Sequence, residues 1–310
     1  MKKILWTVPA IIMIAIGSIY VFIPSTITIS NVRYVTAYHE TVLKFLTNTN
    51  KLENWLQTVA IKKGNTFNYK GYNYTIDRAL TNIVELNISS DKVNLKSNII
   101  SLHIYLDSSA MQWSTELNAG NNPVSRMMTY AEAKKLKESM SGLMNEMKKF
   151  LDNPVNMYGI NVKETQVRDS VVLTTRFKTS VYPTTEEIYK QIDILKSYAM
   201  QQAAITNAPM LYINKVGENN YEAMVGLPIN KVISQTNEIR IKRMPYGGNM
   251  FVTEIKGGNY SIDNGIKKLA EYFNDSKRVT PAIPYQLMIT DRLKEADTTR
   301  WITRLYYPIM

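Results

Sequence analysis

The chain has 310 residues, of which 45% are hydrophobic and 20% charged, an ordinary composition for a folded protein that excludes a largely disordered one. It has no cysteine and two histidines, which excludes disulfides and a cysteine nucleophile and leaves no zinc site of the usual kind. The formal net charge of +11 is spread along the chain without a basic stripe, so no nucleic-acid partner is expected. No metal or other cofactor is expected, and we expect function to reside in a pocket.

The first 25 residues are predicted to form a transmembrane anchor. Ile4 to Ile23 is a stretch of 20 residues without a charge, and as a helix it would be about 30 Å long, the thickness of the hydrocarbon layer. A cleaved signal peptide is the alternative, but the stretch is long and lacks a good cleavage site. Lys2 and Lys3 predict a single-pass membrane protein whose N-terminus is cytoplasmic and whose remaining residues lie outside the cytoplasm.

Residues 26–154 are predicted to form an antiparallel sheet followed by a long helix. Residues 66–118 alternate between apolar and polar side chains and are rich in Tyr, Ile, Val and Thr, which is typical of strands. From Ala131 to Leu151, apolar residues recur at steps of three and four, which predicts an amphipathic helix. Its methionine face, at positions 140, 144 and 147, either lines a ligand cavity or packs as ordinary core.

This order of elements, together with the segment FLTNTNKLENW at residues 45–55, resembles the START-like (polyketide cyclase/SRPBCC) family. The resemblance implies a helix-grip domain, in which a curved sheet holds the long helix and a pocket lies between them. Many family members carry a second tryptophan and a proline soon after the first tryptophan. Here Trp55 is followed by Leu-Gln-Thr instead, so the resemblance identifies no particular ligand.

Residues 155–310 show an internal repeat. Residues 157–181 read as one strand or a hairpin, and Thr184-Thr-Glu-Glu then predicts the start of a helix that continues to about Ala204. Two strands follow, and the order recurs with a helix over Ser261 to Phe273 and with strands at 250–256, 285–290 and 301–308. The expected fold class is therefore α+β: one transmembrane helix, a helix-grip antiparallel sheet domain, and a duplicated strand-helix-strand-strand domain with a cleft between its halves.

Four motifs of this second domain resemble the GyrI-like effector-binding domain: MVGLPI (224–229), EIKGGNYSIDNGIKKLAEYF (254–273), YQLMITD (285–291) and RWITRLYYPI (300–309). The resemblance implies a pocket for a small molecule and, in many members, a glutamate on the closing strand that faces it. This glutamate pairs with cationic lipophilic ligands or acts as an acid/base in members that hydrolyse cyclopropane rings. In this chain the matching position is Arg304, which stays protonated and binds carboxylate or phosphate.

The candidate ligand-binding residues combine this arginine, two acids that could substitute for the missing glutamate, and aromatic side chains expected in the cleft. They are Arg304, Glu222, Glu254, Trp301, Tyr212, Tyr260, Tyr285 and Tyr306. No catalytic or metal-binding residue is assigned.

The sequence thus predicts a membrane-anchored, non-catalytic protein that binds a lipophilic small molecule, with Arg304 favouring an anionic one. The alternatives are a hydrolase of the cyclopropanoid type, a regulator without its own DNA-binding domain, and an interaction module whose pockets are filled. No oligomeric state is predicted.

Overall fold

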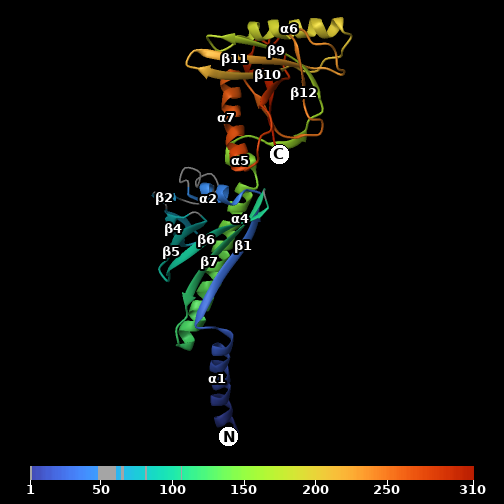
Figure 1. The fold of residues 1–310 in the computed structure, drawn as a ribbon. Coiled ribbons are helices and arrows are strands. Elements are labelled where there is room, and N and C mark those ends of the chain that lie inside the picture. Colours follow the sequence, from blue (N-terminus) through green and yellow to red (C-terminus); the bar gives the residue numbers. More distant parts are fainter. Residues whose placement is uncertain (1, 48–60, 64–65, 81, 106) are drawn as a thin grey trace. The chain divides into compact units, whose positions relative to one another are not determined.

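The computed structural model describes residues 2–47, 61–63, 66–80, 82–105 and 107–310. The chain forms two compact units, Met1–Met157 and Tyr158–Met310 (Figure 1). Each unit is α+β and is built on its own antiparallel sheet, which confirms that part of the predicted fold class.

The apolar run at the N-terminus forms helix α1 (Lys2–Phe22). Over the described residues, no helix has both the length and the apolar character needed to cross a membrane. The predicted transmembrane anchor is therefore wrong, and with it the fold class that began with such a helix, the single-pass localisation and the membrane partner.

The C-terminal end of α1 makes polar contacts within the first unit. The Tyr20 hydroxyl donates to the Asn121 carbonyl at 2.6 Å. The Arg126 guanidinium lies 4.6 Å from the centroid of the Tyr20 ring and donates to the Ile23 carbonyl at 2.8 Å. The prediction rested on the number of uncharged residues along the run. It did not anticipate that Tyr20 and Ile23 would form hydrogen bonds with Asn121 and Arg126, about 100 residues later in the sequence.

The first unit contains a seven-stranded sheet in the order β1-β7-β6-β5-β4-β3-β2. Side-chain burial alternates along β4 and β5, as expected for strands with one face on a core. The helices and strands are β1 (Thr26–Val35), α2 (His39–Thr47), β2 (Ile61–Lys63), β3 (Thr66–Tyr69), β4 (Tyr72–Ala79), β5 (Ile83–Ser89), β6 (Asn94–Tyr105), β7 (Ser108–Asn118) and α4 (Pro123–Leu151).

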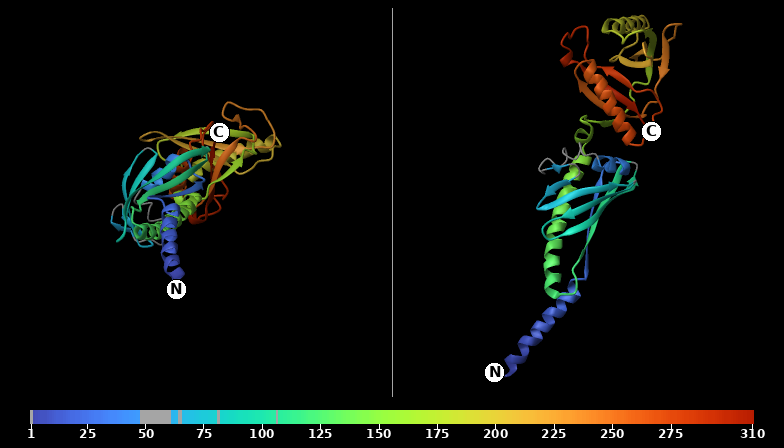
Figure 2. Two further views of the ribbon diagram at one scale, coloured as in Figure 1. Left: turned by 90° about the horizontal axis from the view of Figure 1, so that it is seen from below. Right: turned by 90° about the vertical axis from the view of Figure 1, so that its left-hand side faces the viewer.

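Helix α4 lies along this sheet, and its apolar face forms the core of the unit (Figure 2). Met140, Met144 and Met147 are all buried, so the methionine face packs as core. The helix begins well before the predicted Ala131, because Asn122 caps it by accepting from the amides of the first turn. Trp55 and most of the segment that carried the START-like resemblance lie outside the described residues.

The second unit contains an eight-stranded sheet in the order β12-β9-β11-β10-β14-β15-β13-β8. One order of elements occurs twice, as β9-α6-β10-β11 and as β13-α7-β14-β15. The bounds are α5 (Pro154–Tyr158), β8 (Lys163–Gln166), β9 (Val171–Thr179), α6 (Thr185–Gln201), β10 (Met210–Gly217), β11 (Asn220–Pro228), β12 (Arg240–Arg243), β13 (Asn249–Lys256), α7 (Asn259–Asp275), β14 (Tyr285–Met288), η1 (Thr298–Arg300) and β15 (Ile302–Pro308).

The two halves of this sheet join where β10 pairs with β14, through Met210 opposite Leu287 and Leu211 opposite Gln286. The junction is short, because β10 begins at Met210 and continues beyond it to Gly217 without pairing with β14.

Candidate functional site

Helices α6 and α7 cover the same face of the eight-stranded sheet. The register places Leu211, Gln286 and Leu305 in one row across three strands, so their side chains share a face. Leu211 belongs to the core under α6, and Leu305 packs beside Gly265 of α7. Among the described residues, neither α6 nor α7 covers the opposite face. The neighbours of Leu211, Gln286 and Leu305 along each strand project on this face, because successive side chains alternate between the two faces of a sheet.

A cavity of about 720 Å³ lies on this helix-free face, over the half built from β9, β10, β11 and β12. We call it the sheet cavity. Its floor comes from the strands and its walls from residues 244–249, 281–284 and 308–310. The lining is mainly apolar; besides the main chain of Leu211, its apolar residues are Val167, Val172, Met210, Met224, Met244, Pro245, Pro281, Ala282, Ile283, Pro284, Pro308, Ile309 and Met310.

Two tyrosines contribute aromatic surface to the sheet cavity, Tyr212 from β10 and Tyr285 from β14. The ring of Tyr285 also stacks on Tyr306, with centroids 5.0 Å apart and planes 12° from parallel. The Tyr285 hydroxyl donates to the sulfur of Met250 at 3.5 Å, and burial raises the pKa of Tyr285 above its ordinary value. Tyr285 is therefore held as a neutral, fixed ring between the cavity and the stacked partner.

Arg304 and Glu254, two of the residues predicted for the site, bind each other outside the cavity lining. The Arg304 Nε donates to the Glu254 Oε2 at 3.0 Å, and this hydrogen bond raises the pKa of Arg304. The two side chains are 45% and 52% exposed, so this is a surface ion pair whose charges neutralise each other. The predicted pocket guanidinium is thus already occupied by a carboxylate.

The remaining predicted residues also lie outside the lining of the sheet cavity. Glu222 lies near the start of β11, and its carboxylate is 3.7 Å from the guanidinium of Arg176 on β9. Tyr260, at the start of α7, is 86% exposed. Trp301 is buried on the helix-covered side, where the guanidinium of Arg292 lies 4.9 Å from its ring centroid.

The cavity also contains residues that the sequence analysis did not select. Lys242 and Arg243, on β12, supply the charged groups of the lining, and Gly247 and Gly248 form part of the wall. The signal was present in RIKRMPYGG (240–248), where a proline and two glycines follow a short basic strand. Gly247 has φ +78°, a conformation that favours glycine, so this turn depends on its sequence.

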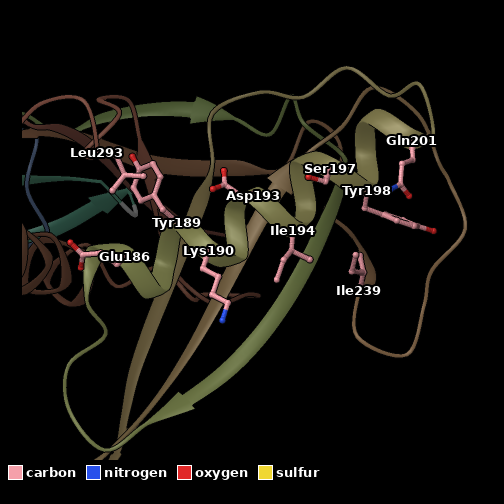
Figure 3. A pocket seen from close by; sticks show the side chains of 10 residues that line it. All are labelled: Glu186, Tyr189, Lys190, Asp193, Ile194, Ser197, Tyr198, Gln201, Ile239 and Leu293. Carbon is pink, nitrogen blue, oxygen red and sulfur yellow. The ribbon is translucent and has the colours of Figure 1, made fainter.

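A second hollow, of about 710 Å³, runs along the outer side of α6 (Figure 3). Its side chains project from successive turns of one helix, and only Ile239 and Leu293 come from other segments. It also carries three charged residues, Glu186, Lys190 and Asp193. A groove made mostly by one helix face cannot surround a small molecule, so the sheet cavity is the better candidate site.

In the first unit, a polar hollow of about 630 Å³ is lined by Tyr72 and Ser89 at the ends of β4 and β5 and by Glu132, Lys135 and Glu138 of α4, and the apolar space deeper between sheet and helix is nearly filled. Among the described residues, the void beneath Trp113 and Met147 has a volume of about 10 Å³, roughly enough for a single water. The indole of Trp113 donates to the Ser97 hydroxyl at 3.1 Å, and the hydroxyls of Tyr74 and Ser139 lie 2.8 Å apart, so the polar groups there have partners.

No family model matches this chain, and no curated protein is detectably similar to it. Among solved structures, the C-terminal domain of EcmrR is 16% identical with a TM-score of 0.42, and the match covers 49% of this chain and 98% of that domain. EcmrR in a complex with DNA is 16% identical with a TM-score of 0.43, covering 61% and 72% of the two chains. A hydrolase from Listeria innocua is 10% identical with a TM-score of 0.39, covering 48% and 91%. At such low identities and TM-scores, these likenesses assign no function to this chain.

Proposed function

We propose that this protein binds a lipophilic small molecule in the sheet cavity and does not transform it. The observation that carries the proposal is the cavity itself: a hollow of about 720 Å³, mainly apolar, with two tyrosine rings in its lining. Ligand sites in proteins are usually hollows of about 300–1,000 Å³ with apolar walls and few polar groups. The sequence resemblance to the GyrI-like effector-binding domain implies a ligand of this kind.

The composition of the lining also favours binding over catalysis. Among the described residues that line the sheet cavity there is no aspartate or glutamate, so the hydrolase alternative has no carboxylate base in contact with a ligand there. Glu254, one of the two acids expected to substitute for the family glutamate, is paired with Arg304 outside the lining. Met210, Met224 and Met244 adapt their shape readily, which suits a site for apolar ligands.

A neutral fluorescent probe tests this proposal. N-phenyl-1-naphthylamine has an apolar body of drug-like size and no charge, so its binding measures the apolar cavity alone. We expect one probe to bind per full-length chain, with a blue-shifted emission. Met224→Trp projects a larger ring from the floor of the cavity and should weaken binding at least about tenfold, a loss of about 1.4 kcal/mol.

The matched control is Met200→Trp, the same substitution at a residue of α6 that is 78% exposed and remote from the lining. It should leave the affinity unchanged. A probe that does not bind, or that binds both variants as well as the original chain, would contradict the proposed site.

A further inference from the structure

The charged side chains that line the sheet cavity are all of one sign. Lys242 and Arg243 line it, and among the described lining residues no acid accompanies them. Lys242 stands opposite Val172 in the pairing of β12 with β9, and Val172 also lines the cavity. Directly opposite residues project on the same face of a sheet, so the Lys242 side chain is directed to the cavity face.

The Lys242 ammonium has no carboxylate partner among the described residues. By contrast, the neighbouring cation Arg176 has Glu222 at 3.7 Å, and Arg304 has Glu254 at 3.0 Å. Burial lowers the pKa of Lys242, and the positive charge of Arg176 lowers it further. No carboxylate side chain among the described residues therefore balances the charge of Lys242, and an anion bound beside it would do so.

We infer that the sheet cavity selects lipophilic molecules that carry an anionic group, and that Lys242 binds this group. The apolar body of the ligand then occupies the space between Met224 and Tyr285. This inference rests on the proposed function and adds the class of ligand. It transfers the anion-binding role, which the sequence analysis gave to Arg304, to a residue whose charge is free.

A pair of probes that differ in a single group tests this inference. 8-Anilinonaphthalene-1-sulfonate is N-phenyl-1-naphthylamine with one added sulfonate, so the ratio of their dissociation constants measures the contribution of the anion. We expect the sulfonate to bind the full chain about tenfold more tightly than the neutral probe. Lys242→Met keeps the length of the side chain and removes its charge, and it should abolish this preference while the neutral probe still binds.

The matched control is Lys178→Met, the same substitution on β9 with the same change in net charge, at an exposed residue outside the lining. It should leave the preference for the sulfonate intact. Equal affinity for the two probes in the original chain would overturn the inference, as would equal losses in both lysine variants. Absence of binding by the neutral probe would instead reject the proposed function itself. The ratio in the original chain needs no variant, so the inference is tested even if Lys242→Met fails to fold.

Discussion

Replacing Tyr285 with leucine removes an aromatic wall of the sheet cavity and one ring of a stacked pair. The same substitution at Tyr306 removes the other ring of that pair but no part of the lining. The two variants therefore lose the same stacking interaction, and only one of them alters the cavity. Comparing them separates the role of Tyr285 in ligand binding from its role in stability.

The magnitudes follow from the geometry. A stacked aromatic pair contributes about 0.5–1.5 kcal/mol beyond its buried area, and replacing a half-buried ring with leucine adds a similar loss of packing, so each variant should lose about 1–3 kcal/mol of folding free energy. In a unit of this size, that lowers the Tm by about 2–12 °C. Tyr285→Leu should also weaken binding of N-phenyl-1-naphthylamine by about 1–2 kcal/mol, which is about 5- to 30-fold in Kd.

Circular dichroism melts measure the first effect, and fluorescence titration of the folded variants measures the second. The expected result is a similar drop in Tm for the two variants, with weaker probe binding for Tyr285→Leu alone. Equal affinities in the two variants would show that the cavity beside Tyr285 is not where the probe binds, and the reasoning that assigns the site would be wrong.

Three further substitutions test other parts of the structure. Gly265→Ala should lower the Tm, because the new Cβ would lie 2.7 Å from a side-chain carbon of Ile255. Such overpacking costs about 1–3 kcal/mol, which exceeds the gain in helix propensity of about 1 kcal/mol. A rise in Tm would contradict this close approach. Thr184→Ala removes the cap of α6 and should cost about 1 kcal/mol in thermal melts, and an unchanged Tm would show that the cap is dispensable. Arg304→Gln should change the affinity for either naphthalene probe by less than about twofold, because the pair is half exposed and outside the lining; a larger loss in the titration would return Arg304 to the site.

The start of α6 shows what local sequence determines. Thr184-Thr-Glu-Glu predicted a helix start, and the structure has the helix at Thr185–Gln201 with a reciprocal capping box between Thr184 and Glu187. The cap requires residues within one turn, so no distant partner decides it. The start of α4 depends on the same kind of signal: Asn122 caps the helix and Pro123 occupies its first position, whereas the prediction, based on apolar periodicity alone, began at Ala131.

Elements that depend on distant pairing were predicted less well. Residues 157–181 were expected to form one strand or a hairpin, yet β8 pairs with β13 and β9 pairs with β11 and β12. The short strand β12 (Arg240–Arg243) was not predicted, because four residues with three cations have little strand character without the neighbouring β9. The N-terminal run was predicted to span a membrane from its length and lack of charge, but over the described residues no helix is both long and apolar enough to do so.

The candidate site was predicted only in part for a related reason. The two-residue period of a strand puts Arg304 and Tyr306 on one face and Trp301 on the other, and the side-chain pairing across the sheet agrees. The position of the hollow on that face is set by the walls at residues 244–248 and 281–284, which lie outside the strands. No periodicity along the strands can predict those walls, so Lys242 was not selected and Arg304 was.

A crystal structure of the full chain with bound 8-anilinonaphthalene-1-sulfonate is the most direct test. We expect electron density for the naphthalene ring between Met224 and Tyr285, with the sulfonate within hydrogen-bonding distance of the Lys242 ammonium. Density for the probe in the groove along α6, beside Arg304, or in the first unit, with the sheet cavity left without it, would contradict the assignment of the binding site.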